Sequence, residues 1–383
     1  MGLSKIRAGV VGIGFIGVTH IEALRRLGVE VAGVVGSSPE RTRPKADSLG
    51  LETYENVEAL ASDPTIDVVH ITSPNYAHAE QVRICLKAGK HVVCEKPLAL
   101  NSSDTADLVA RADTSGLVNA VCFNIRFYPQ NHQAMAMVKK GDVGVPRLIT
   151  GSYHQDWLLL DTDWNWRLQL EEGGSLRAVA DIGSHWLDLA RFISGRNVEA
   201  VMADLHTLVP VRRHPSGPVE TFAAVDEGTD LIEEKMTSDD AAGILLRFEG
   251  GARGAVTISQ VSAGQKNSVR YELAGSDSSV SWFSGNPDDL LIGHRGRANE
   301  IMQRDPGLAA PEAERTIGYP GGHVEGFPDT FRALFQQVYG DVEKGAPSAE
   351  PTYPTFADGH DAVLVTDAIG QSHREQRWTA VQR

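Results

Sequence analysis

The feature that most constrains the fold is a glycine pattern near the N-terminus. The run GIGFIG at residues 12–17 follows an apolar strand predicted over residues 6–13 and opens a helix predicted over residues 15–28. In such a motif the first glycine allows a tight turn, the second lets the backbone approach a pyrophosphate, and the third lets helix and strand pack closely. The helix N-terminus then offers unpaired N–H groups to phosphates. The pattern predicts a dinucleotide site that includes Gly12, Gly14, Phe15, Ile16 and Gly17.

Strands and helices continue to alternate up to about residue 123. Further apolar strands are predicted at 30–36, 68–72, 91–94 and 117–123, and helices at 41–49, 57–62, 78–88 and 102–115. Strands separated by helices imply right-handed crossovers and a parallel sheet covered on both faces. Residues 1–124 are therefore predicted to form a doubly wound Rossmann domain.

Longer strand patterns dominate after residue 125. They are predicted at 147–157, 198–208, 241–249, 252–261, 268–274 and 279–283, with a hairpin turn at Glu249-Gly250-Gly251. Helices are predicted at 181–194, 328–344 and 356–370, and irregular structure at 210–240 and 285–320. Residues 125–383 are therefore predicted to form a second α/β domain with a large, mostly antiparallel sheet open on one face.

Composition excludes several classes of partner. The 383 residues carry a formal net charge of −14, which repels phosphate backbones and anionic lipid, so neither nucleic acid nor a membrane is expected as a partner. The three cysteines lie in apolar runs and are expected to be reduced, as in a cytoplasmic protein. The chain shows no CxxC motif or Cys/His cluster, so no metal is predicted, and no long apolar segment follows Met1.

The end of the second strand bears on the choice of coenzyme. No acid stands at the strand end itself, where one would bind the ribose hydroxyls and repel a 2′-phosphate. Ser37, Ser38 and Arg41 could hold a 2′-phosphate, whereas Glu40 opposes one, and Arg41 could simply be solvated. Both NAD and NADP remain open as cofactors.

Polar residues follow the third and fourth strands. Ser73-Pro74-Asn75 and Glu95-Lys96-Pro97 stand where the carboxyl ends of parallel strands face the ligand crevice of an open α/β sheet. A lysine there can exchange a proton or hold a substrate oxygen as a cation. The alternative is an exposed loop lysine paired with Glu95.

A second cluster combines an acid and a histidine. Asp181 and His185 are four residues apart, which places them on one face of a helix within side-chain reach. A carboxylate beside an imidazole suits a base that removes a proton from an alcohol. A metal site including Asp188 is a thin alternative, since a second histidine is missing. A capping aspartate and a hydrogen-bonded core histidine would also explain the pair.

Aromatic and polar residues are dense before this cluster. They run from Tyr153 to Trp157 and return at Trp164, Trp166 and Arg167. Aromatic faces interleaved with hydrogen-bonding groups suit a sugar ring, although core packing explains some of them equally well. Strand alternation puts His154 and Asp156 on one face and leaves open which face lines a pocket.

Together these motifs resemble the glucose–fructose oxidoreductase, inositol dehydrogenase and rhizopine-catabolism family (Gfo/Idh/MocA). The resemblance spans nearly the whole chain and is carried by GIGFIG at 12–17, SPNYAH at 73–78, AGKHVVCEKPLA at 88–99, FNIRFYP at 123–129 and ADIGSHWLDLARF at 180–192. It implies an NAD(P)-dependent oxidoreductase that acts on a sugar, polyol or glycoside hydroxyl. It also implies a homodimer or homotetramer, because the open sheet often forms the subunit contact in this family.

The resemblance also implies residue roles. Lys96 is similar to the lysine that contacts the substrate hydroxyl, and His185 to the catalytic acid/base, with Asp181 as its neighbour and a substrate contact. Cofactor-lining positions correspond to Ser73, Pro74, Asn75, His78, Glu95, Lys96, Asn124 and Arg167. Implied substrate contacts are Lys96, Arg126, His154, Asp156, Trp157, Trp166, Arg167, Asp181, His185 and His323.

The stretch YHQDW at 153–157, with WRLQ at 166–169, resembles a looser subgroup of sugar and glycoside dehydrogenases of the levoglucosan type. Some relatives in the family use the same lysine and histidine as redox-neutral glycoside hydrolases, and a nearby base such as Tyr153 or Tyr128 would favour that reaction. A cofactor-binding regulator without catalysis is a third hypothesis. Arg126, Arg167 and Arg177 leave an anionic sugar open as the substrate.

Overall fold

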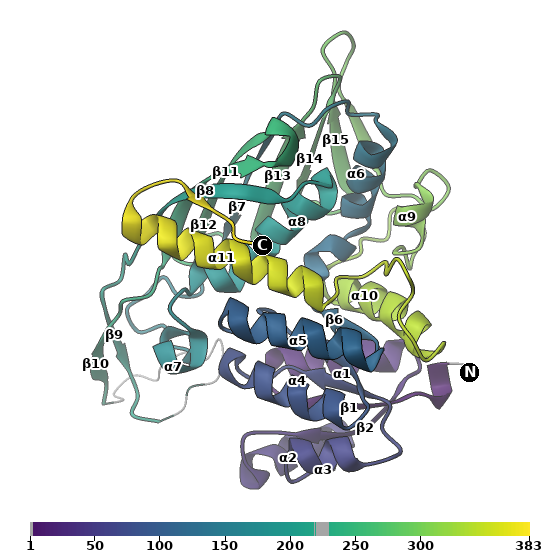
Figure 1. The fold of residues 1–383 in the computed structure, drawn as a ribbon, viewed down its shortest axis with the longest axis vertical. Helices are drawn as coiled ribbons and strands as arrows, with labels where there is room; N and C mark the ends of the chain where they lie inside the picture. Colours follow the sequence, from purple (N-terminus) through teal and green to yellow (C-terminus); the bar gives the residue numbers. More distant parts are fainter. Residues whose placement is uncertain (1–2, 218, 220–229) are drawn as a thin grey trace. The chain divides into compact units, whose positions relative to one another are not determined.

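The computed structural model describes residues 3–217, 219 and 230–383. The chain divides into two units (Figure 1). The first comprises the residues up to Asn124 together with Phe331–Val363, and the second comprises Ile125–Thr330 with Leu364–Arg383. The chain crosses between them at Asn124 and within two helices, α10 (Phe327–Val342) and α11 (Phe356–Glu375).

The sheet of the first unit is parallel throughout, as predicted. Its strands follow the order β3-β2-β1-β4-β5-β6, and every pair is parallel. They are β1 (Arg7–Val11), β2 (Glu30–Val35), β3 (Glu52–Thr53), β4 (Val68–Ile71), β5 (His91–Cys94) and β6 (Asn119–Val121). The order reverses between β1 and β4, and the carboxyl ends of strands at such a point form the ligand crevice of this fold.

Helices connect these strands. They are η1 (Leu3–Lys5), α1 (Phe15–Arg26), α2 (Pro39–Leu49), α3 (Val57–Ser62), η2 (Asn75–Ala77), α4 (His78–Lys87) and α5 (Ser102–Ser115). Local signals fix their ends: the Asn101 side chain accepts from the N–H of Asp104 at the start of α5, and Gly116 ends the helix at φ 65°.

The extent of the first unit differs from the predicted division at residue 124. Residues 331–363 group with the N-terminal part rather than with the second unit. The physical reason is apolar packing: Phe356 and Ala362 lie in the same buried cluster as Leu98, Leu108 and Val121. A linear reading of the sequence cannot show that a distant helix returns to complete this core.

The second unit is built on a nine-stranded sheet of order β16-β15-β14-β13-β7-β12-β11-β8-β17. Its strands are β7 (Leu148–His154), β8 (Val198–His206), β11 (Ala241–Phe248), β12 (Arg253–Ser259), β13 (Ser268–Ala274), β14 (Ser279–Phe283), β15 (Asp289–Gly293), β16 (Glu300–Gln303) and β17 (Thr379–Ala380). All neighbours pair antiparallel except β7 and β12, which are parallel. The mostly antiparallel sheet and the hairpin through η6 (Glu249–Gly251) are confirmed.

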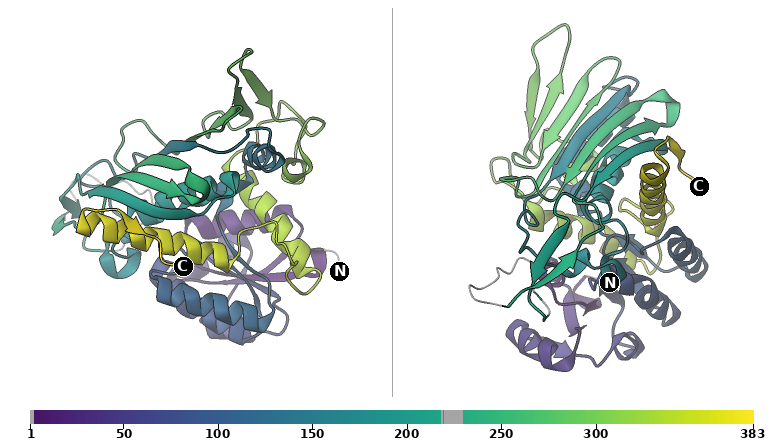
Figure 2. Two further views of the ribbon diagram at one scale, coloured as in Figure 1. Left: turned by 45° about the horizontal axis from the view of Figure 1, so that its top comes forward. Right: turned by 90° about the vertical axis from the view of Figure 1, so that its left-hand side faces the viewer.

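Helices cover one face of this sheet (Figure 2), and they include the part of α11 whose residues Val365, Ala368 and Ile369 belong to the same buried cluster as the sheet. Contacts place α8 (Ser184–Ser194) against β7 and β13, and α6 (Pro129–Lys140) against β14 and β15. Trp186 on α8 is fully buried and donates through its indole N–H to the carbonyl of Arg270, 2.8 Å away. The remaining short helices are η3 (Asn124–Phe127), η4 (Trp166–Leu168), α7 (Leu170–Gly173), the π-helical turn η5 (Val179–Gly183) and α9 (Pro311–Glu314).

Three segments differ from the prediction. The expected loop at 210–240 contains a hairpin of β9 (Val211–His214) and β10 (Ile232–Lys235), while its residues 218 and 220–229 lie outside the described part. The expected irregular region 285–320 contains β15, β16 and α9, and the helix α6 was not predicted. The hairpin escaped detection because its buried residue is the charged Arg212 rather than an apolar side chain.

Across the described ranges, none of the helices is both long enough and apolar enough to cross a bilayer.

One buried histidine gives a prediction about stability. His132 on α6 is 3% exposed, and neither ring nitrogen has a hydrogen-bond partner among the described residues. Burial, with the charges of Arg315 and Arg126, lowers the pKa of His132 to about 3. Between pH 6.5 and 3, this histidine is protonated in the unfolded chain but neutral in the folded chain. Each unit by which the pH is lowered in this range therefore reduces the free energy of unfolding by about 1.4 kcal/mol.

We therefore expect the free energy of unfolding of His132→Leu, relative to that of the wild type, to increase by roughly 2 kcal/mol when the pH is lowered from 7 to 5. Urea unfolding at the two pH values measures the shift. The exposed His206→Leu serves as the control and should show none. Parallel pH curves for wild type and His132→Leu would contradict the assignment.

Candidate functional site

The glycine loop has the geometry of a pyrophosphate cradle. Gly12 has a φ of 94°, and a Cβ there would lie 2.6 Å from the backbone of Thr72. A Cβ at Gly17 would lie 2.1 Å from the carbonyl oxygen of Gly12, whereas a Cβ at Gly14 would meet nothing within 4 Å. Gly14 precedes α1, and no side chain caps this helix. The loop therefore leaves space above Gly14, next to the N-terminus of α1, where phosphate oxygens would bind.

This geometry separates two substitutions that look alike in sequence. Gly14 has φ −68° and ψ −168°, which alanine tolerates, so Gly14→Ala should fold like the wild type but place a methyl group against the pyrophosphate. We expect its Kd for NAD to rise at least tenfold, as measured by calorimetry. Gly17→Ala should instead lower the melting temperature, because its Cβ clashes with backbone. Equal effects of the two variants on stability would contradict this account.

The residues that follow β2 differ in whether their side chains already have hydrogen-bond partners. Ser38 is the N-cap of α2, and its hydroxyl accepts from the N–H of Arg41 at 3.4 Å. Ser37 and Arg41 are exposed. Hydrogen bonds from its own backbone N–H and from Ser38 lower the pKa of the exposed Glu40. The first turn of α2, directly after β2, therefore carries a negative charge.

The loops after β1, β4 and β5 are tied to one another. The Thr72 hydroxyl donates to the carbonyl of Gly12 at 2.7 Å, and the Ser73 hydroxyl donates to Gln81 at 2.6 Å. His78, 1% exposed, contacts the carbonyls of Ser73 and Pro97 through its two ring nitrogens, at 2.9 and 2.8 Å. Burial lowers the pKa of His78, so the neutral ring donates to one carbonyl at a time. This histidine fixes the spacing of the two loops.

Asn75 opens η2 after Pro74 and is 8% exposed, and Asn124, the last residue of the first unit, is 2% exposed. Both therefore lie largely beneath the surface. The aromatic ring of Phe15 is half exposed, at 51%.

A buried chain of hydrogen bonds ends at Glu95. His20 Nε2 lies 3.1 Å from Glu95 Oε1, His20 Nδ1 lies 3.0 Å from His70 Nδ1, and His70 Nε2 lies 2.9 Å from the Tyr339 hydroxyl. A carboxylate only accepts, so His20 Nε2 donates to Glu95, His70 Nδ1 donates to His20, and Tyr339 donates to His70. Burial, with the adjacent His20, lowers the pKa of His70, which fits its neutral form.

This series of hydrogen bonds fixes the backbone next to the candidate catalytic lysine, Lys96. The backbone N–H of Lys96 donates to the other carboxylate oxygen of Glu95 at 3.1 Å. Cys122 Sγ lies 3.7 Å from His20 Nε2, so His20, Glu95 and Cys122 also form a close set of potential metal ligands. Hydrogen bonds account for the positions of all three. Glu95 thus holds the backbone of Lys96 in place.

The corresponding cluster in the second unit lies at the ends of two strands. Because β7 and β12 are parallel, their carboxyl ends meet at one edge of the sheet, and the chain there continues into Gln155 and Gln260. The π-helical turn η5 carries Asp181 to these residues. Single π-turns in helices frequently mark functional sites. The predicted helix at 181–194 thus begins two residues earlier, in π rather than α geometry.

Both oxygens of Asp181 have partners. Arg167 Nε donates to Oδ1 at 3.3 Å, and Gln260 Nε2 donates to Oδ2 at 2.8 Å. The Arg167 guanidinium also lies 4.3 Å from the centre of the Trp166 ring. The Asp181 side chain keeps 14% exposure. It is therefore an oriented carboxylate that remains partly exposed.

His185 lies on the first turn of α8 and is 6% exposed. Its ring centre is 6.4 Å from that of Tyr153, whose hydroxyl donates to Asn267 at 2.7 Å. Burial, with the Asp181 charge, raises the pKa of Tyr153 far above its usual range, and burial raises that of Tyr128 to about 12. Neither tyrosine is therefore ionised near neutral pH.

Two arginines predicted as candidate anion ligands are held in ion pairs. Arg126 forms a two-pronged ion pair with Asp188, and its Nε lies 2.6 Å from Oδ2. Arg177 is 2% exposed and pairs with Asp240. An anionic substrate at Arg177 would have to displace this buried pair, so the structure argues against that role.

The aromatic segment divides between its two faces. His154 bonds to Thr257 at 3.0 Å, and Asp156 bonds to Lys266 at 2.9 Å. On the other face, Trp157 donates to Gln155 at 2.8 Å, and the same Gln155 oxygen is 3.4 Å from the amide nitrogen of Gln260. The structure thus brings the Trp157 face to Asp181. His323 is exposed and contacts the carbonyl of Gly321 at 3.3 Å.

Sequence reasoning missed three of the residues that organise these clusters. Gln155 and Gln260 follow the last residues of strands, and His20 lies on the predicted first helix. A polar residue at the end of an otherwise alternating apolar strand was the available signal for Gln260.

Family-level comparison matches both parts of the chain. Residues 6–123 match the oxidoreductase family with an NAD-binding Rossmann fold, GFO/IDH/MocA, and residues 131–281 match the GFO/IDH/MocA C-terminal domain.

Among individual relatives, the chain is similar to levoglucosan dehydrogenase of Pseudarthrobacter phenanthrenivorans, at 29% identity over 99% of both chains. It is also similar to myo-inositol 2-dehydrogenase of Thermotoga maritima, at 27% identity over 97% of both chains. A solved structure of levoglucosan dehydrogenase in complex with NADH and L-sorbose superposes with a TM-score of 0.87, at 26% identity over 99% of both chains.

Proposed function

Because the chain belongs to the GFO/IDH/MocA family of NAD-binding oxidoreductases that act on sugars or polyols, we propose that it is a net dehydrogenase of a cyclic sugar or polyol. It removes hydrogen from one secondary C–H/O–H group and releases a ketone. The observation that carries this proposal is that one chain has both an intact glycine cradle and an Asp181 carboxylate oriented by two side chains, four residues before His185.

In the proposed reaction, NAD when bound supplies the acceptor for the hydride. His185 takes the hydroxyl proton of the substrate, so that hydride and proton together account for the two hydrogens lost. Lys96 donates a hydrogen bond to the same oxygen and stabilises its developing negative charge. Asp181 orients the neighbouring polar groups and contacts a second hydroxyl.

The cofactor residues fit this assignment. The glycine loop and the uncapped start of α1 hold the pyrophosphate, and the anchored loops after β4 and β5 line the nicotinamide side. We propose NAD rather than NADP. The ionised Glu40 opposes a 2′-phosphate, the Ser38 hydroxyl is engaged as a helix cap, and the similar levoglucosan dehydrogenase is complexed with NADH.

Recognition of the sugar is proposed to use Trp157, Trp166 and Arg167. Aromatic faces cover the C–H surface of a ring, and Arg167 offers N–H groups beside Asp181. Four further residues stay proposed substrate contacts, although each already contacts another group in this structure: His154, Asp156, Arg126 and His323.

A redox-neutral glycoside hydrolase is less well supported. That reaction needs an additional base to remove the proton next to the transient ketone. Burial raises the pKa of Tyr153 and of Tyr128 above the ordinary tyrosine value, so both hydroxyls are harder to deprotonate to supply that base. We test the proposed function with purified protein, NAD or NADP, and a panel of anhydrosugars, inositols, free sugars and glycosides. Substrate-dependent absorbance at 340 nm supports it, and its absence across the panel overturns it.

A further inference from the structure

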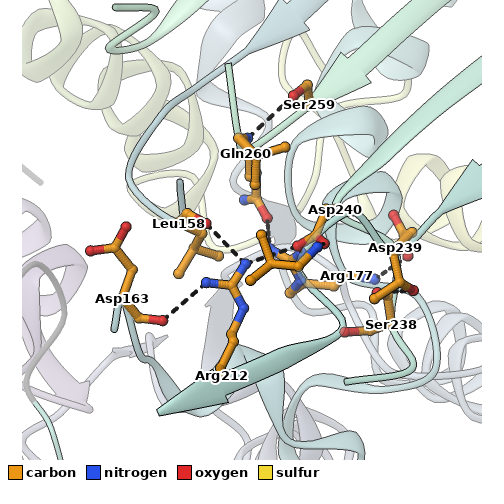
Figure 3. A network of polar contacts seen from close by, with 12 residues as sticks. Leu158, Asp163, Arg177, Arg212, Ser238, Asp239, Asp240, Ser259 and Gln260 are labelled. Carbon is orange, nitrogen blue, oxygen red and sulfur yellow. Dashed lines mark hydrogen bonds and ion pairs between the residues drawn. The ribbon is translucent and has the colours of Figure 1, made fainter. Parts of the chain in front are cut away.

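A buried polar network in the second unit (Figure 3) includes Gln260, the side chain that donates to Asp181. Its members are Arg177, Arg212, Asp240 and Gln260, with exposed fractions of 2%, 0%, 1% and 0%. Two arginines and one aspartate are costly to bury unless each finds partners, so a network of this kind imposes a strict geometry on its neighbours.

Gln260 connects this network to the acid. Its amide oxygen accepts from Arg177 Nη1 at 2.8 Å, and its amide nitrogen donates to Asp181 Oδ2 at 2.8 Å. Arginine has only donors, so the amide oxygen must face Arg177 and the NH₂ group must face Asp181. These two partners therefore determine which way the Gln260 amide faces.

Arg177 is itself held in place. Its guanidinium pairs with Asp240 Oδ1, which also accepts from Arg212 Nη2 at 3.0 Å. Arg212 then donates to three carbonyl oxygens of one segment: those of Leu160 at 2.8 Å, Leu158 at 2.9 Å and Asp163 at 3.2 Å. Segment 158–165, which follows the aromatic stretch, is thereby tied to the same network as Asp181.

The aromatic stretch itself makes a second connection. Gln155 Oε1 accepts from the Trp157 indole at 2.8 Å and lies 3.4 Å from Gln260 Nε2. The backbone N–H of Leu158 donates to the carbonyl of Gln260 at 3.2 Å. The Gln260 side chain therefore contacts the acid and the arginine network directly, and it reaches the Trp157 indole through Gln155.

We infer that Gln260 is a positioning residue, which holds the Asp181 carboxylate in one orientation and links it to segment 158–165. This inference rests on the proposed function, since it assigns Asp181 a role in turnover. Other charged or titratable groups around Asp181 include Arg167, Arg177, Tyr153 and His185, which lies one helical turn along the chain.

The test compares two substitutions that keep the size of the side chain. Gln260→Glu places a second carboxylate against Asp181, and two such groups retain a shared proton to higher pH. The acidic limb of the kcat/KM profile should move up by about one pH unit or more. Gln260→Met removes the donor without adding charge, so kcat should fall roughly tenfold and the limb should move up by less than in Gln260→Glu, with the KM for NAD unchanged.

Gln265→Glu, in the loop that follows β12, is the matched control for the added charge and should keep the wild-type profile. If Gln260→Glu and Gln260→Met share the wild-type limb, Gln260 is only structural and the inference is overturned while the dehydrogenase assignment stands. If the wild type itself turns over no sugar or polyol, the proposed function fails and the positioning role fails with it.

Discussion

His185→Asn is expected to lower kcat by about 10²- to 10⁴-fold, the range typical for loss of a general base. Asparagine keeps the approximate size of the ring and its capacity for hydrogen bonds but cannot take the hydroxyl proton. His185 is 6% exposed on the first turn of α8, so the smaller change His185→Asn preserves packing better than alanine would. Steady-state kinetics with saturating NAD and the best substrate of the panel measures the loss.

Binding of NAD should be retained in this variant, because the pyrophosphate cradle is formed by residues 12–17. His206→Asn, an exposed histidine on β8, is the matched control and should keep kcat within about twofold of wild type. A His185→Asn enzyme with wild-type turnover would remove His185 from the catalytic role and leave the proton acceptor to another group.

Lys96→Met is expected to have an effect of similar size, about 10²- to 10⁴-fold in kcat/KM. Methionine keeps the length of the side chain but loses the charge that stabilises the developing negative oxygen. The Glu95 carboxylate, held by His20 and by the Lys96 N–H, keeps the backbone in place, so the loss reports on the ammonium group rather than on the loop.

Lys96→Arg provides a sharper comparison because it keeps the charge and changes only the shape of the donor. It should recover part of the binding of substrate but little of kcat. Lys87→Met, at the exposed end of α4, is the control for loss of a lysine and should behave as wild type. If Lys96→Met turns over substrate normally, the lysine is a structural loop residue paired with Glu95.

The sequence predicts the nucleotide-binding half of the molecule well because its signals are local. A glycine motif, buried strands and alternating helices are each written in a few consecutive residues, and the parallel sheet follows from them. The same short glycine motif also accounts for the space above Gly14 and for the lack of room for a Cβ at Gly17.

The cluster around Asp181 depends on contacts between residues that are distant in the sequence. Arg212 lies in a segment whose polar composition predicts a loop, yet its side chain is fully buried because Asp240 and three carbonyl groups surround it. Gln260 and Gln155 meet because β7 and β12 are parallel neighbours, a pairing that strand periodicity alone does not specify. The return of Phe356 to the first core is non-local in the same way.

The most direct test of the central claim is the stoichiometry of reduced nicotinamide and of released aglycone in one reaction with a chromogenic glycoside and NAD. A net dehydrogenase produces one NADH for each substrate consumed and releases no aglycone. Aglycone released without accumulation of NADH would contradict the claim, because the hydride would then be returned to the sugar within each turnover.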